Sequence, residues 1–241
     1  MPHESLDIAE SAHAAASACA AWMLQELRNV LGAQAIARIA VSGGSSPKLM
    51  FDTLAKTRFD WSRVHIFWVD ERCVPPSDSQ SNYRMANENW FIPSAVPTEN
   101  IHRIKGELPP AEGESDYVGE IRRSFGLGES ELPAFDIIHR GMGADAHTAS
   151  LFPGEPLIGD RSRIAAAVYV KKLNMHRVTL LPGVLLAAKK TVLLATGEDK
   201  AEPLFQVLRG PEDPFRFPCQ IATRGAFNAL WFIDRAAAAR L

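Results

Sequence analysis

Cysteine is scarce in this chain, which has three among 241 residues. Cys19, Cys73 and Cys219 lie far apart and form no C-x-x-C pair. A disulfide-stapled miniprotein is therefore excluded, and the pattern fits a reducing compartment better than an oxidising one. Because no Cys/His cluster has the spacing of a zinc site either, we expect a cytoplasmic protein without a bound metal.

The sequence also lacks a long apolar run and an excess of charge. No stretch approaches the ~20 apolar residues of a membrane span, and the acidic N-terminal segment has no basic region typical of a secretion signal. Lys and Arg number 26 against 28 Asp and Glu, a formal net charge of −2. That balance is unlike the basic footprint of a nucleic-acid-binding protein. We expect neither membrane nor nucleic acid as a partner, and the sequence leaves the oligomeric state open.

What is present is an ordinary globular composition, 46% hydrophobic and 22% charged, which can bury a sizeable core. Short apolar segments alternate with helical patterns. The expected strands are 36–41, 64–69, 101–104, 135–138, 166–170, 191–195 and 230–233. The expected helices are 5–30, 47–56, 81–91, 112–125, 183–189 and 198–208. This alternation predicts a single α/β domain over residues 1–241, with a mainly parallel, doubly wound sheet and helices on both faces. Ligands of such sheets bind beyond the carboxyl ends of the strands.

The first of four polar segments expected at that edge is VSGGSSPK at residues 41–48. Glycines let backbone N–H groups approach an anion closely, and a helix N-terminus adds partial positive charge. The missing Gly-Lys-Ser/Thr ending disfavours a nucleotide with Mg²⁺. The segment predicts anion binding by Gly43, Gly44, Ser45 and Ser46. The alternative is a plain strand-to-helix turn with a serine cap.

The second segment, VDERCVP at residues 69–75, is followed by SNYR at 81–84. Two carboxylates and a guanidinium directly after an apolar strand favour a functional cluster, in which Asp70 or Glu71 holds Arg72 or serves as a base. The alternative is a solvated loop ion pair that contributes under ~1 kcal/mol.

The third segment follows the strand at 135–138 and reads HRGMGADAHTASLFPG over residues 139–154. Its G-x-G-x-x-A pattern superficially matches a dinucleotide fingerprint. However, Pro153 and Gly154 end any helix after about nine residues, which is short for a crossover helix. Asp145 and His147, two residues apart at an expected helix N-terminus, can reach one pocket instead, and His147 is the best catalytic candidate among the seven histidines.

The fourth segment combines HRVTL at 176–180 with TGEDKA at 196–201. Arg177 and Lys200 offer fixed positive charge for a phosphate, although Lys200 alone also fits an ordinary helix surface. Other chemistry has no motif here: H-E-x-x-H and the G-x-S-x-G elbow are both absent.

Taken in order, SGGSSP, VDER-x-VP with SNYR, FDII-x-x-GMGADAHTASLFPG, RVTL and ATGEDKA resemble the 6-phosphogluconolactonase family and cover nearly the whole chain. The resemblance implies hydrolysis of 6-phospho-D-glucono-1,5-lactone to 6-phosphogluconate in the oxidative pentose phosphate pathway, without a metal or an organic cofactor. The related glucosamine-6-phosphate deaminases resemble the chain in the same loops. They carry Asp-Glu-Tyr where this chain has Arg72 as the third residue, and Ala-Phe-Asn-Glu-Pro where it has residues 149–153. The acidic residue expected for ring opening is therefore missing from this segment.

Two departures from the family pattern stand out. Ala146 replaces the second glycine of Gly-x-Asp-Gly-His, and His139 with Arg140 occupies strand positions that are usually apolar. If position 146 needs a positive φ, alanine costs ~1 kcal/mol or more there. We expect a backbone conformation that alanine tolerates. The alternative is a displaced turn, which would make the chain a catalytically degenerate sugar-phosphate-binding protein.

Lactone hydrolysis needs a base, a donor for the developing oxyanion and an anchor for the phosphate. We expect His147 to be the base, because an imidazole titrates near working pH. Asp145 or Asp70 would orient the imidazole or the water, and Arg72 would serve the oxyanion or the phosphate. The expected phosphate cradle is Gly44, Ser45, Arg177 and Lys200. Within the resemblance, Asn82 of SNYR also belongs to the substrate-binding set.

Overall fold

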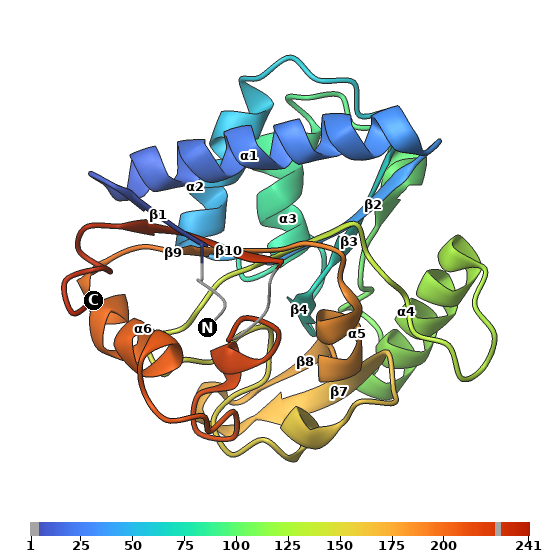
Figure 1. The fold of residues 1–241 in the computed structure, drawn as a ribbon. Coiled ribbons are helices and arrows are strands. Elements are labelled where there is room, and N and C mark those ends of the chain that lie inside the picture. The colour runs from blue at the N-terminus through green and yellow to red at the C-terminus, as the bar shows by residue number, and fades with distance from the viewer. Residues whose placement is uncertain (1–4, 225–227) are drawn as a thin grey trace.

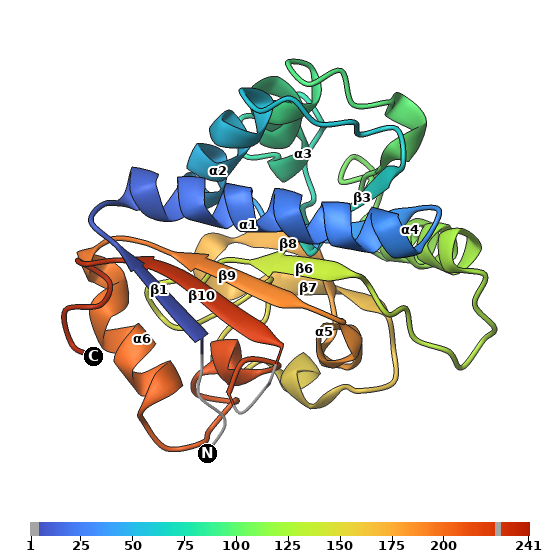
Figure 2. The same cartoon turned by 45° about the horizontal axis from the view of Figure 1, so that its top comes forward.

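A seven-stranded parallel sheet forms the centre of the computed structural model, which describes residues 5–224 and 228–241. Its order is β1-β10-β9-β6-β2-β3-β5, as Figures 1 and 2 show. The strand bounds are β1 Ser5–Ala9, β2 Ala37–Val41, β3 Val64–Trp68, β5 Ile101–His102, β6 Ile137–Arg140, β9 Thr191–Ala195 and β10 Ala229–Asp234. The fold class predicted from the sequence, a mainly parallel doubly wound sheet, is confirmed.

Helices cover both faces of this sheet. Their bounds are α1 Ala12–Ala33, α2 Ser45–Ala55, α3 Asn82–Ala86, α4 Pro110–Phe125, α5 Pro182–Ala187 and α6 Ala201–Leu208. In Figure 2, α1 and α2 lie over one face, while α6 and α5 lie on the other. Strands β2, β3 and β9 are buried almost throughout, which explains why they read as continuous apolar runs rather than alternating ones.

The strand order reverses direction between β2 and β6. From β2 the chain adds β3 and β5 on one side, and then β6, β9 and β10 on the other. All these pairs are parallel, so the segments that follow β2, β3, β6 and β9 leave the sheet at the same edge. The reversal is a topological switch point, the place where open α/β sheets bind ligands.

The helix predicted over residues 5–30 is wrong at its N-terminal end, over residues 5–11. Residues Ser5–Ala9 form β1, an edge strand that pairs in parallel with β10, and α1 begins only after Ser11. The Ser11 hydroxyl accepts a hydrogen bond from the Ala14 backbone N–H at 3.3 Å, which marks the true N-terminus of the helix. Leu6 and Ala9 fall in phase with the helical stripe, and their partner strand lies some 220 residues along the sequence, so periodicity alone missed it.

A second, three-stranded antiparallel sheet with the order β4-β8-β7 was not predicted. It consists of β4 Asp70–Arg72, β7 Ala165–Val170 and β8 Met175–Leu180. Two expectations are therefore corrected: residues 166–170 do not join the parallel sheet, and Arg177 lies in a strand rather than in a loop. The two sheets are joined at Val69, which accepts a hydrogen bond from Leu180 N at 2.8 Å.

Smaller corrections concern helix ends near the carboxyl edge of the parallel sheet. Helix α2 begins at Ser45, so Pro47 is its third residue rather than its first. Residues 144–154 form turns and a bridge between Thr148 and Leu151 instead of a short helix, because Ala146 and Ala149 adopt positive φ. The segment at 81–91 is α3 followed by a π-helix over Asn87–Phe91. Among the described residues, no helix is long and apolar enough to cross a membrane.

The predicted extent of the domain, residues 1–241, includes 1–4 and 225–227, which lie outside the described residues, and it stays a prediction.

Candidate active site

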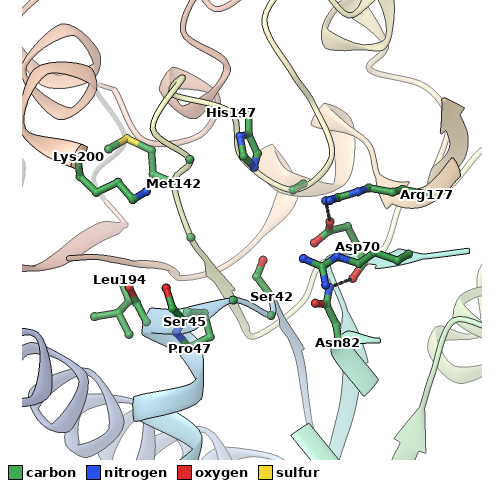
Figure 3. A pocket seen from close by; sticks show the side chains of 17 residues that line it. Ser42, Ser45, Pro47, Asp70, Asn82, Met142, His147, Arg177, Leu194 and Lys200 are labelled. Carbon is green, nitrogen blue, oxygen red and sulfur yellow. Dashed lines mark hydrogen bonds and ion pairs between the residues drawn. The ribbon is translucent and has the colours of Figure 1, made fainter. Parts of the chain in front are cut away.

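A cavity of about 200 Å³, open to solvent, lies at the switch point between β2 and β6. Figure 3 shows side chains from all four predicted segments around it. Its lining includes ten of the eleven predicted site residues: Gly43, Gly44, Ser45, Ser46, Asp70, Arg72, Asn82, His147, Arg177 and Lys200. Asp145 is the exception, because it stands behind His147. Ser42, Pro47, Met142 and Leu194 complete much of the wall.

The N-terminus of α2 opens into this cavity. Gly44 is its N-cap with φ 126, and no side chain caps the helix, so its first backbone N–H groups are free for an anion. Gly43 is required by a close approach, because a Cβ there would stand 2.1 Å from Asn82 Oδ1. Ser46 instead donates to or accepts from the Thr196 hydroxyl at 2.7 Å, and so ties α2 to the segment after β9.

Glu71 has a structural role, because its carboxylate is bonded to backbone N–H groups and a serine hydroxyl and not to the Arg72 guanidinium. Its buried carboxylate accepts hydrogen bonds from the backbone N–H groups of Arg72, Asn82 and Tyr83 at 2.7, 2.8 and 2.7 Å. The Ser81 hydroxyl donates a fourth at 3.0 Å. Burial raises the pKa of this carboxyl, against the opposing effect of those hydrogen bonds. Glu71 therefore fixes the start of α3, where Asn82 faces the cavity.

Asp70 is buried and pairs with groups from the third and fourth polar segments. It accepts a hydrogen bond from Ser150 Oγ at 2.7 Å, and Arg177 Nη1 lies 3.5 Å from the same oxygen. Burial lowers the pKa of Arg177, and Asp70 opposes that effect. Because no hydrogen bond joins Asp70 to His147, Asp70 orients Arg177 and Ser150 rather than the imidazole. Ser150 lies in the third polar segment, but the sequence interpretation assigned it no role.

Arg72 and Lys200 bring two further cations to the cavity. Arg72 lines the cavity, and its Nη1 donates to the Gln80 carbonyl oxygen. Lys200 ends a 3₁₀ turn over Glu198–Lys200 after β9, and its ammonium contacts Asp199 at 2.6 Å. In Figure 3, Lys200 and Arg177 reach inward from opposite sides.

His147 is positioned by Asp145. The two side chains are joined by a hydrogen bond of 2.5 Å between His147 Nδ1 and Asp145 Oδ1. A carboxylate can only accept, so Nδ1 is the donor and Nε2 carries the free electron pair. Gly143 leaves room for this pair, since a Cβ there would lie 2.0 Å from Nδ1. Phe152 stacks on the imidazole with 4.2 Å between ring centroids.

Lys172 is a second residue that the sequence interpretation missed. Its ammonium forms an ion pair with Asp145 Oδ2 and lies 4.3 Å from the centroid of the Phe152 ring. Burial alone would raise the pKa of the Asp145 carboxyl, but hydrogen bonds from His147 and Lys172 outweigh it and hold that pKa well below its usual range. Asp145 is therefore a fixed negative charge behind the imidazole.

We expected Ala146 to have a backbone conformation that alanine tolerates and to leave His147 in place, and only the second part agrees with the structure. Its φ is 62°, which is the left-handed region and not one that alanine adopts without cost. The turn nevertheless carries His147 into the cavity, and Cys219 N donates to the Ala146 carbonyl oxygen at 2.9 Å. The methyl group is buried in a cluster with Met142 and Trp231. The fold thus bears the strain at this position without displacing the histidine.

The second departure from the family pattern, His139 with Arg140, lies inside the sheet and away from the cavity. Both side chains on β6 are fully buried. Arg140 Nη2 donates to the Ile221 carbonyl oxygen at 2.7 Å, while neither ring nitrogen of His139 has a partner among the described residues. Neither residue lines the candidate site.

Four buried polar atoms on the cavity side chains have no partner within the described part of the chain. They are Ser42 Oγ, Asn82 Oδ1, Arg72 Nε and Arg177 Nε. Buried polar atoms are normally hydrogen-bonded, so these are the groups that a polar ligand would satisfy. Residues 5–224 and 228–241 contain no group of three His, Cys, Asp or Glu side chains placed to hold a metal ion.

Comparison with known proteins identifies the class to which this fold and site belong. Residues 10–231 match the profile of the family described as glucosamine-6-phosphate isomerases/6-phosphogluconolactonase. The chain belongs to this family.

Several similar relatives within the family are 6-phosphogluconolactonases. A 6-phosphogluconolactonase of a Nostoc species is 34% identical over 91% of this chain and 90% of its own length. One from Haemophilus influenzae is 36% identical, covering 83% and 85%, and the human one is 33% identical, covering 86% and 81%. Among solved structures, a 6-phosphogluconolactonase from Thermotoga maritima is 25% identical with a TM-score of 0.81 over 95% of this chain and 99% of that one.

Proposed function

We propose that this chain is a 6-phosphogluconolactonase, an enzyme that hydrolyses 6-phospho-D-glucono-1,5-lactone to 6-phosphogluconate in the pentose phosphate pathway. The single observation that carries the mechanism is the geometry of His147. Its Nδ1 is bound by Asp145 at 2.5 Å, and its ring faces a cavity with Arg72, Arg177 and Lys200 in the wall. A base next to clustered cations suits an anionic substrate that must be attacked by water.

In the proposed reaction, His147 Nε2 removes a proton from a water as the water oxygen attacks the lactone carbonyl carbon. The tetrahedral oxyanion is stabilised by donors in the cavity wall, for which Arg72 is a candidate. When the bond from that carbon to the ring oxygen breaks, His147 returns the proton to the ring oxygen, and the free acid then ionises. Asp145 stabilises the imidazolium between the two steps, as a buried carboxylate does in a hydrolytic triad.

The substrate phosphate is proposed to bind at the start of α2 and at Lys200. The free N–H groups after Gly44 and the Ser45 hydroxyl face the cavity beside the Lys200 ammonium. A helix N-terminus and a lysine are a common combination for phosphate. Arg177 lies on the opposite wall of the cavity, where its guanidinium is already paired with Asp70. Binding energy from the phosphate would then hold the ring in place for attack.

The deaminase alternative has less support because the third segment lacks an acid. Where the related deaminases carry a Glu after the histidine, this chain has apolar side chains, and Phe152 packs directly on His147. Residues 148–154 contain no Asp or Glu that could supply a carboxylate next to the imidazole.

The deciding experiment is a direct assay with freshly prepared 6-phosphogluconolactone. The lactone also hydrolyses spontaneously, so the rate is measured against a blank without enzyme. Ammonia release from glucosamine 6-phosphate is measured in parallel, and a positive result there would replace the lactonase proposal by the deaminase one. Tight binding of 6-phosphogluconate with no rate above the blank would instead identify a degenerate binding protein.

We further propose a cytoplasmic location. All three cysteines are free, and Cys19 and Cys219 are buried, as expected of a protein from a reducing compartment. A small sugar phosphate, rather than a nucleic acid, is the proposed partner.

A further inference from the structure

Lys172 stands on the turn between β7 and β8, in the short 3₁₀ segment Lys171–Leu173. The antiparallel sheet brings this turn against the third polar segment, some 25 residues away in the sequence. Nothing in the proposed reaction requires a lysine here, and Lys172 does not line the cavity. Its contacts nevertheless all lead to His147.

Two independent contacts connect the ammonium to the imidazole. Lys172 pairs with Asp145 Oδ2, while the other oxygen of the same carboxylate accepts from His147 Nδ1. The ammonium also lies 4.3 Å from the centroid of the Phe152 ring, which stacks on His147. The carboxylate is thus bound at both oxygens, and the aromatic ring contacts both the ammonium and the imidazole.

We propose that Lys172 is a positioning residue that locks the Asp145 carboxylate onto His147 and offsets part of its negative charge. This inference rests on the proposed function, since it concerns the base of that reaction. An isolated carboxylate at Nδ1 would favour the protonated imidazole, which cannot act as a base. A nearby ammonium reduces that preference and keeps the free base available at lower pH.

The other charged groups around His147 do not replace this effect. Asp145 is the one carboxylate in contact with the imidazole among the described residues. From β8, the Arg177 guanidinium lies 5.7 Å from the Phe152 ring centroid but is paired with Asp70. Arg72 and Lys200 line the cavity from other elements and would be engaged by the substrate.

The test compares Lys172→Met with Lys172→Arg, and with Lys171→Met as a matched control. Lys171 is an exposed neighbour on the same turn and forms no ion pair with any residue that the structure describes. Lys172→Met should move the acid limb of the pH–rate profile to higher pH by about half a unit. At acid pH this shift is a roughly threefold loss of kcat, and the loss largely disappears by pH 8. Lys172→Arg should retain the wild-type profile, as should Lys171→Met. Every rate is corrected for the blank, and all variants share one substrate, so its own titration cancels.

An NMR titration of the His147 ring separates this inference from the proposed function. In Lys172→Met the midpoint should shift upward whether or not the protein hydrolyses lactone, and in an Asp145→Asn background the same substitution should produce a smaller shift. An unchanged midpoint in Lys172→Met would overturn the inference. So would equal shifts in Lys172→Met and Lys171→Met, since these would reflect net charge alone. Inactivity of the wild type toward lactone, with the NMR shift intact, would count against the proposed reaction only.

Discussion

At the scale of single residues, the role of the histidine that faces the cavity can be tested most directly. His147 is held by a hydrogen bond to Asp145 and by stacking on Phe152, and it carries no part of the core. We predict that His147→Ala removes most of the rate above the blank, in the range of ~10²–10⁴-fold for loss of a general base. Binding of 6-phosphogluconate, measured by calorimetry, should stay nearly intact. Turnover like that of the wild type would remove His147 from the mechanism.

Ala146 presents a balance of two opposing energies. Its left-handed φ of 62° costs ~1–2 kcal/mol for an alanine, while its buried methyl group contributes ~0.8 kcal/mol. Ala146→Gly should therefore change the free energy of unfolding by less than ~1 kcal/mol. Because the turn already places His147 in the cavity, lactonase activity should change less than about tenfold, or ~1.4 kcal/mol on the barrier. A larger gain in activity would show that the natural turn misplaces His147.

Ala95 provides the matched control for Ala146. It also adopts a positive φ, 49°, but it is exposed and has no buried methyl group to lose. Ala95→Gly should therefore stabilise the protein by up to ~1 kcal/mol, a rise in Tm of about 2–4 °C. Thermal unfolding of both variants side by side separates the backbone strain from the packing.

At the scale of elements, the sequence was most informative where strands are parallel and buried. Segments after such strands must meet at one edge of the sheet, and for that reason Gly44, Arg72, His147 and Lys200 were grouped correctly without coordinates. Lys172 could not be found in this way, because it reaches Asp145 through an antiparallel sheet. One strand of that sheet, Asp70–Arg72, consists of charged residues that no β-propensity favours.

The junction of α2 with the turn after β9 should act as the phosphate anchor. If Lys200 and the free N–H groups of α2 hold the phosphate, Lys200→Gln should weaken binding of 6-phosphogluconate by at least about tenfold. Binding of unphosphorylated gluconate should hardly change. The ratio of the two dissociation constants, measured at fixed ionic strength, is the readout.

Lys48→Gln is the control for this charge. Lys48 lies on α2 itself, but it is half exposed and paired with Asp52 at 3.1 Å, outside the cavity lining. Its removal should affect both ligands slightly and equally. Equal losses for both ligands in Lys200→Gln would likewise assign Lys200 a structural role instead of a phosphate contact.

At the scale of the whole molecule, the most unusual feature is a polar pair in the middle of the sheet. His139 and Arg140 occupy β6 between β2 and β9, where the surrounding positions are apolar and fully buried. The central sheet forms despite this local conflict, because its other strands supply a continuous apolar core. The composition of those strands was enough to predict the fold class. The effect of the polar pair on stability could not be predicted, because it depends on how deeply the two side chains of β6 are buried.

His139 should make the stability of the whole protein depend on pH. Complete burial lowers its pKa from the ordinary value to about 3, so between pH 6.5 and 3 the unfolded chain binds a proton that the folded one does not. Stability is then fully present above about pH 6.5 and falls by up to ~1.4 kcal/mol per pH unit below it.

His139→Leu should remove that slope, so that its stability gain over the wild type is about 2 kcal/mol larger at pH 5 than at pH 7.5. Urea unfolding at both pH values measures this difference, and His13→Gln, at an exposed position of α1, should leave the wild-type pH dependence in place. A parallel pH dependence in His139→Leu and the wild type would mean that β6 opens to water and that its histidine is not held neutral.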